Sequence, residues 1–174
     1  MPSKATRARM LADVRRRIDE HGWTVQAVGA QCSVPGCCSS YLSPASDDAD
    51  FGYTIGLSRY RGHPELIVTG IPQLETTHPL NLMGERVRDG ERFAGGDLVD
   101  DLCPCTSLVA LIEVDPRKSV EYLLVANQVY RNPGGPPVRA LQMVWPDQRG
   151  RFPWDWGYSL PASAQPLLGP VPEV

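Results

Sequence analysis

The chain has 174 residues, a net charge of −3 and an apolar fraction of 42%. This length suits one domain, residues 1–174, that buries a real core. The acidic balance argues against a protein that binds nucleic acid through phosphate contacts. No apolar run approaches the ~20 residues that a membrane-spanning helix needs, and no apolar stretch typical of a secretory signal follows the basic residues near the N-terminus. We therefore expect a cytoplasmic protein with neither a nucleic-acid nor a membrane partner.

The N-terminal segment, residues 1–20, carries a predicted helix from residue 4 onward. Three apolar residues recur at i, i+4 and i+8 and form one stripe, which is typical of a helix packed on a core. They are Met10, Val14 and Ile18. Residues 23–28 then alternate between two faces, which predicts a strand.

Residues 30–50 form a long loop that contains three of the five cysteines. Gly, Pro, Ser and Asp occur throughout this loop, and it has no hydrophobic period. Connections of this length in a compact domain are usually functional or disordered.

The stretch from Phe51 to Pro72 organises the rest of the chain. It predicts a strand over 51–57, a turn-rich loop and a second strand over 65–70. We expect the two strands to pair antiparallel. The loop brings polar, ionisable side chains to the start of an apolar strand, which is where a site would be built.

Two helices and two strands are predicted in the second half. One helix covers roughly 73–89, with a break at Pro79 because proline disrupts a helix interior. TSLVALIEV at 106–114 is the most apolar run and predicts a central strand. A helix then starts at Asp115-Pro116 and reaches Tyr130.

A final strand is predicted over 138–145, and residues 151–174 read as an irregular C-terminal arm. Strands and helices alternate only in part along the chain. The sequence therefore predicts an α+β fold, a mixed and mainly antiparallel sheet with two or three helices packed on it.

Several blocks of sequence occur in a fixed order. They are HGW at 21–23, YTIGL at 53–57, HPELIVTGIP at 63–72, GERF at 90–93, IEVDP at 112–116 and LQMVWPDQRGRFPWD at 141–155. With these blocks the chain resembles the bacterial domain-of-unknown-function family numbered 4262. The resemblance covers nearly the whole chain and implies no activity. In that family the loop before YTIGL is usually shorter and not rich in cysteine, so the resemblance implies no role for the cysteines.

The cysteines form two clusters, C-x4-C-C and C-x-C. They are Cys32, Cys37, Cys38, Cys103 and Cys105. Each cluster precedes a predicted strand, so the two could converge if those strands run parallel as neighbours. Four thiolates would suit a structural Zn(II) or, as a second choice, an iron–sulfur cluster. Inert thiols and a redox pair stay open as alternatives.

His63 and Glu65 are the candidate catalytic residues, since an imidazole and a carboxylate close together can act as a general base and its orienting partner. They could equally bind a metal or anchor a ligand. The alternative is a structural loop in which His63 bonds a backbone carbonyl and Glu65 pairs with an arginine.

Five residues are candidate ligand-binding residues because they are polar or aromatic and lie at predicted strand ends. They are Tyr53, Thr54, Arg59, Gln142 and Trp145. For the aromatic residues near the C-terminus, including Trp154 and Trp156, the competing interpretation is that they fasten the arm to the body.

No G-x-S-x-G, phosphate-binding glycine loop or H-E-x-x-H motif is present. The leading interpretation is therefore a small protein that binds a small molecule or a partner protein, with a structural metal held by the cysteines. One alternative is a hydrolase or metal-dependent enzyme that uses His63 and Glu65. Another is an immunity-type interaction protein.

Overall fold

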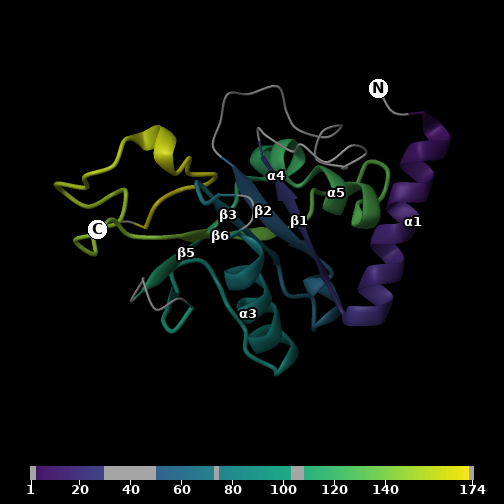
Figure 1. The fold of residues 1–174 in the computed structure, drawn as a ribbon, viewed down its shortest axis with the longest axis horizontal. Helices are drawn as coiled ribbons and strands as arrows, with labels where there is room; N and C mark the ends of the chain where they lie inside the picture. The colour runs from purple at the N-terminus through teal and green to yellow at the C-terminus, as the bar shows by residue number, and fades with distance from the viewer. Residues whose placement is uncertain (1–2, 30–49, 73–74, 103–107, 173–174) are drawn as a thin grey trace.

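The computed structural model describes residues 3–29, 50–72, 75–102 and 108–172. In these ranges the chain has the predicted α+β fold, a six-stranded mixed sheet with helices on both faces (Figure 1). The helices are α1 (Lys4–His21), α3 (Thr77–Arg88), α4 (Pro116–Tyr122) and α5 (Leu124–Tyr130), with short 3-10 turns η1 (Leu57–Arg59) and η2 (Ala162–Ala164). The strands are β1 (Thr24–Val28), β2 (Phe51–Ile55), β3 (Glu65–Thr69), β4 (Leu98–Val99), β5 (Val109–Glu113) and β6 (Ala140–Val144). None of the described helices is long and apolar enough to cross a membrane.

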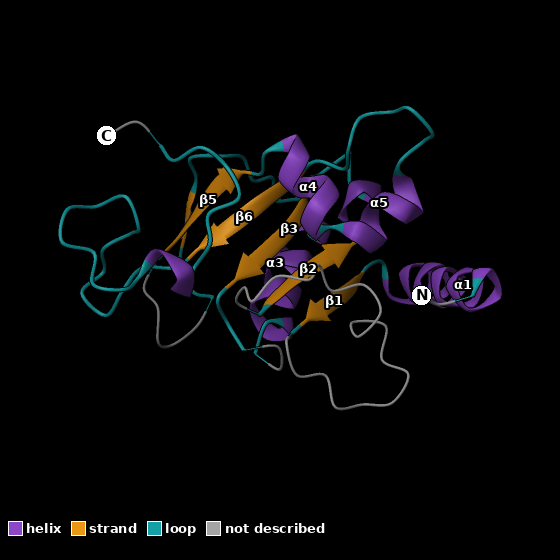
Figure 2. Ribbon diagram, turned by 90° about the horizontal axis from the view of Figure 1, so that it is seen from above, coloured by secondary structure: helices purple, strands orange, loops and turns teal. Residues whose placement is uncertain are grey.

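The strand order is β1-β2-β3-β6-β5-β4, and Figure 2 shows β1 at one side of the sheet next to α1. As predicted, β2 and β3 pair antiparallel, with Tyr53 opposite Ile67. At the centre β3 and β6 pair parallel, with Glu65 opposite Ala140. The segments that lead into two parallel neighbours meet at the same edge of a sheet. The loop before β3 and the loop before β6 therefore lie side by side.

The sheet buries apolar side chains on both faces. Helix α3 covers one face with Leu80, Met83 and Val87. Helices α1, α4 and α5 cover the other face, where Ile18 and Leu123 are buried (Figure 1). A sheet covered on both sides explains why all five residues of β2, β3 and β6 are buried.

Helix α1 forms where the apolar stripe predicted it. Ser3 caps its N-terminus by accepting a hydrogen bond from the Thr6 amide at 3.2 Å. Gly22 ends the helix at φ 94°, and its amide donates to the Ile18 carbonyl at 2.8 Å. Val14 and Ile18 of the stripe are buried.

The prediction of a helix over 73–89 broken at Pro79 is wrong. Helix α3 begins at Thr77 and continues without a break to Arg88. Pro79 therefore lies in the first turn, where backbone amides have no partner within the helix and a missing N–H costs nothing.

The single helix predicted from Pro116 to Tyr130 is two helices that meet at Leu123, which has φ −91° and ψ 49°. Asp115 caps α4 as predicted, accepting from the Arg117 amide at 2.7 Å. The side chain of Asn127 donates to the carbonyls of Ser119 at 2.9 Å and Leu123 at 3.0 Å. It thereby bonds carbonyls at the junction, which the pattern of apolar residues could not reveal.

The apolar run predicted as a central strand is β5, which begins at Val109 in the described residues. It pairs with β6 on one side and with the two-residue strand β4 on the other. The predicted strand is therefore an interior strand with a neighbour on each side, and β3 and β6 occupy the middle of the sheet.

Gly84 in α3 gives a testable prediction about the packing of the α3 face. A Cβ at this position would lie 2.6 Å from Cε2 of the buried Trp23 ring. Glycine to alanine usually stabilises a helix by about 1 kcal/mol, but here the ring would have to move. We expect Gly84→Ala to lower the free energy of unfolding by about 1–3 kcal/mol in urea titrations. The control is His78→Ala, at an exposed position of the same helix, which should change the free energy of unfolding by less than about 0.5 kcal/mol. A stabilised Gly84→Ala protein would contradict this packing.

Candidate functional site

The ladder between β2 and β3 ends at the pair Tyr53–Ile67, and side chains bridge the opening beyond it. The Thr54 hydroxyl accepts from the Leu66 amide at 2.9 Å and donates to Oε2 of Glu65 at 2.7 Å. The amides of Gly56 and Leu57 donate to the same carboxylate at 2.9 and 3.2 Å. Glu65 thus binds the start of η1 and closes the gap between the two strands.

Glu65 is 1% exposed, and its burial raises the pKa of the carboxyl to about 7. The hydrogen bonds from Gly56, Thr54 and Leu57 act in the opposite direction, because they favour the charged form. The result is a carboxyl group that changes charge near neutral pH inside the fold. Groups with such pKa values are candidates for a functional site.

His63, also 1% exposed, lies at the end of the loop before β3. Its Nε2 accepts a hydrogen bond from the Phe93 amide at 3.2 Å, so the ring proton is on Nδ1, which donates to the Pro64 carbonyl at 2.7 Å. Burial lowers the pKa of His63, and the charges of Arg92 and Arg139 lower it further. The imidazole is therefore neutral at pH 7, and the backbone holds both of its nitrogens.

His63 and Glu65 line one cavity of about 270 Å³. Its walls come from the two loops that lead into the parallel strands β3 and β6. The other lining residues are Ser58, Gly62, Pro64, Tyr130, Arg131, Asn132, Gly135, Pro136, Pro137, Val138 and Arg139. We call this space the His63–Glu65 cavity. Among the described contacts no hydrogen bond joins His63 to Glu65, so the structure brings the two side chains to one cavity but does not couple them.

No motif singled out the cavity wall formed by residues 130–132 and 135–139. The run Asn132-Pro133-Gly134-Gly135-Pro136-Pro137 reads only as a breaker between a helix and a strand. Tyr130 adds a hydroxyl whose pKa is raised by burial and by the charge of Glu65. The parallel pairing of β3 with β6 brings this wall to the cavity. A single sequence does not reveal that pairing, so the wall could not be predicted from it.

Three predicted ligand-binding residues make hydrogen bonds with other parts of the protein. Tyr53 is buried, and its hydroxyl accepts from the Val125 amide of α5 at 3.2 Å. Thr54 bonds Glu65, as described above. Arg59 donates to the Ile18 carbonyl at 2.8 Å and to Asp19 at 3.2 Å, so it fastens η1 to the end of α1.

The other two, Gln142 and Trp145, hold the C-terminal arm. The amide nitrogen of Gln142 donates to Thr69 at 2.9 Å and to the Pro166 carbonyl at 2.8 Å, and its oxygen accepts from the Leu168 amide at 2.7 Å. The backbone amide of Trp145 donates to the side-chain oxygen of Gln165 in the arm, and its carbonyl accepts from the side-chain nitrogen of Gln165, both at 2.9 Å. The Trp145 indole itself donates to the Thr69 carbonyl of β3 at 3.0 Å. These contacts agree with the interpretation that such residues fasten the arm to the body.

Asp147 organises the turn at the start of the arm. Its carboxylate accepts from the amides of Arg149, Arg151 and Ser159, and these bonds help to lower the pKa of Asp147 to about 2. Farther along, Trp154 stacks on Phe152 at a centroid distance of 5.2 Å. Trp156 is 94% exposed, so of these two tryptophans only Trp154 makes a ring contact among the described residues.

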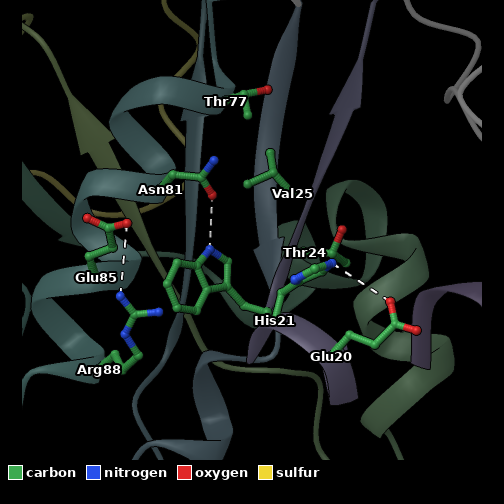
Figure 3. Close-up of a pocket in the computed structure, with 9 residues that line it drawn as sticks. Glu20, His21, Thr24, Val25, Thr77, Asn81, Glu85 and Arg88 are labelled. Atoms are coloured by element: carbon green, nitrogen blue, oxygen red, sulfur yellow. Dashed lines mark hydrogen bonds and ion pairs between the residues drawn. The ribbon is translucent and has the colours of Figure 1, made fainter. Parts of the chain in front are cut away.

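A second, larger hollow of about 600 Å³ lies between β1, α3 and the end of α1 (Figure 3). We call it the β1–α3 pocket. Its polar groups bond one another: the Trp23 indole donates to Asn81 at 3.0 Å, and Arg88 lies 4.0 Å from Glu85. Glu20 pairs with Arg16 at 3.2 Å and lies 3.8 Å from His21.

All five cysteines, which are the predicted metal ligands, lie outside the described residues. Within the described ranges no group of three His, Cys, Asp or Glu side chains gathers to hold a metal ion.

The pKa of Glu65 gives a prediction about stability and pH. Between the ordinary pKa of 4.5 and the folded value of about 7, the folded protein keeps a proton that the unfolded chain has lost. The stability contributed by this group is therefore fully present below pH 4.5 and is lost as the pH rises to 7. We expect the unfolding free energy of the wild type, minus that of Glu65→Gln, to fall by about 3 kcal/mol across this window.

Urea unfolding at a series of pH values measures this difference, and the opposite effect of the lowered pKa of His63 cancels because both proteins retain that residue. A carbon-13 titration of the Glu65 carboxyl in the wild type gives an independent value. A difference that does not change with pH, together with a carboxyl that titrates near 4.5, would contradict the prediction.

Comparison with known proteins adds a family but no activity. No curated protein matches the chain, and no solved structure matches it either. The sequence model of the family described as a domain of unknown function, DUF4262, matches residues 17–159, which include both strands that flank His63 and the whole cavity wall. The chain therefore belongs to the DUF4262 family, as its sequence blocks indicated.

Proposed function

We propose that the protein binds a small molecule in the His63–Glu65 cavity. The observation that supports this is that two buried ionisable groups, His63 and Glu65, line the same cavity. Ligand sites are usually concave and carry a few convergent polar groups. A volume of about 270 Å³ suits a small molecule or one end of a larger one, since the pockets that bind drug-sized ligands measure roughly 300–1,000 Å³.

The β1–α3 pocket is a weaker candidate although it is larger. His21, Asn81, Glu85 and Arg88 are all exposed, so they are already solvated. Most of the charged groups there also pair with each other or with α1. A ligand would gain little from replacing such contacts, because exposed pairs contribute about 0–1 kcal/mol.

A catalytic role of His63 and Glu65 has less support than binding. A general base needs a free nitrogen within reach of the substrate, and the Phe93 amide and the Pro64 carbonyl bond both nitrogens of His63. The Glu65 oxygens likewise accept from Thr54 and from the backbone of η1. These contacts favour a rigid binding cavity over a reactive pair.

A screen of small fragments by amide NMR tests the binding proposal. Neutral, cationic and anionic fragments are added to the labelled full chain, and we expect saturable shifts at Gly62 and Gly135, which line the cavity. The variant Ser58→Trp places a large side chain at the cavity and should weaken binding at least about tenfold.

Thr77→Trp is the matched control, because it adds the same side chain to the β1–α3 pocket. If fragments bind only at that pocket, or if Thr77→Trp rather than Ser58→Trp removes the binding, the proposed site is wrong. Both variants change exposed positions, and their melting temperatures show whether each one is folded.

We also propose that the cysteines bind one structural zinc ion. Support comes from the strands that follow the two clusters in sequence. Strands β2 and β5 run in the same direction and so begin at the same end of the sheet. The further condition that the two strands are neighbours is not met, because β3 and β6 lie between them and the strand spacing puts them about 14 Å apart.

Elemental analysis of the protein purified without chelator or affinity-column metal tests the zinc proposal. We expect about one zinc per chain, with thiols that become reactive only after denaturation. A tetrahedral site uses four thiolates, so four of the five single Cys→Ser variants should lose the metal and one should keep it. Iron in place of zinc would indicate a cluster. Absence of metal with five freely reacting thiols would refute the proposal.

A further inference from the structure

Arginine side chains gather around the His63–Glu65 cavity. Arg131 and Arg139 line it, and the charge of Arg92 helps to lower the pKa of His63, which also lines it. Of these three, only Arg139 has a carboxylate within 4 Å in the described residues, Glu113 at 3.9 Å, and its own side chain is 70% exposed. The chain as a whole is acidic, with a net charge of −3. The cavity is therefore a locally positive site on a negative protein.

The guanidinium groups are oriented but not neutralised by backbone contacts. The Nε of Arg131 donates to the Gly135 carbonyl at 2.9 Å, which fixes the side chain over the Gly-Pro wall. Arg92 donates through Nη1 to the Arg61 carbonyl at 3.1 Å. An arginine has five N–H donors, so Arg131, which lines the cavity, retains donors for a ligand.

Charge inside the cavity points the same way. Glu65 is the one carboxylate among the described lining residues, and its burial raises the pKa of the carboxyl to about 7, which favours the neutral form. His63 is neutral, and part of the reason is the positive field of Arg92 and Arg139. Ser58 and Tyr130 add two hydroxyl groups, which hydrogen-bond each other.

We infer that the His63–Glu65 cavity binds a small anion, a carboxylate or phosphate group, between the guanidinium groups of Arg131 and Arg139. This inference rests on the proposed binding function and adds the chemical class of the ligand. Guanidinium groups bind carboxylate and phosphate oxygens through paired, charge-assisted hydrogen bonds. The anion is either a free ion or the charged end of a larger molecule, because the cavity is small and Arg139 is exposed.

Titration of the full chain with sodium sulfate, phosphate or acetate tests the inference. The ionic strength is held constant with sodium chloride, and amide NMR follows Gly62, Asn132 and Gly135. We expect saturable shifts for sulfate and phosphate, for acetate, or for all three. The tetrahedral and planar ions distinguish a phosphate-type from a carboxylate-type ligand. The variants Arg131→Gln and Arg139→Gln should each weaken binding about ten- to a hundredfold.

The control is the single variant Arg15→Gln, which removes one positive charge, as each cavity variant does, from the exposed face of α1 and should leave binding unchanged. Arg131→Lys should restore only part of the affinity, because an ammonium lacks the planar fork. If the cavity variants bind the ions as tightly as the control does, the ion is adventitious and the inference is wrong.

The outcome for neutral fragments separates this inference from the proposed function. Suppose that neutral fragments bind in the cavity, that Ser58→Trp blocks them, and that none of the three anions binds saturably. The anion inference would then be wrong, whereas the proposed binding site would stand. Absence of binding by any fragment or ion would overturn both.

Discussion

The structure around the His63–Glu65 cavity depends on the hydrogen bonds of the Glu65 carboxyl group, which is buried between the ends of β2 and β3. A carboxyl group without solvent must receive hydrogen bonds from the protein, and here the donors include the amides of Gly56 and Leu57. They converge because Gly56 has φ 131°, at a point where a Cβ would lie 2.8 Å from Cα of Trp23. The same turn holds Arg59 against the end of α1. One buried side chain thus connects the sheet, η1 and the N-terminal helix.

The parallel pair at the centre of the sheet determines where a cavity can form. The Glu65 amide donates to the Arg139 carbonyl at 2.9 Å, just before β3 and β6 begin their ladder. The loops that precede these strands carry different chemistry. One contributes the buried His63, and the other contributes a Gly-Pro wall with two arginines. An antiparallel arrangement would have placed the two loops at opposite edges of the sheet.

All residues of the two central strands are buried, and among them β3 has a polar residue at each end and β6 has one in its middle. Glu65 begins β3, and Thr69 ends it. Thr69 bonds Gln142 of β6, which in turn holds the arm through Pro166 and Leu168. Each of these polar groups has partners supplied by a loop or by the arm, which is the condition for burying them without a large cost. Irregular segments are therefore needed to complete the sheet.

Several local features could be predicted from the sequence alone, although the break at Pro79 and the single helix from Pro116 to Tyr130 were predicted wrongly. The stripe of α1, the cap at Asp115 and the pairing of β2 with β3 followed from periodicity, capping chemistry and short connections. The sequence also indicated His63 and Glu65, because polar residues before an apolar strand are conspicuous. Tertiary structure decided the rest. Only the parallel contact between β3 and β6 brings Arg131 and Arg139 to His63, and only the space between two strands makes Glu65 buried. Such contacts join residues far apart in the chain, and no pattern within one segment records them.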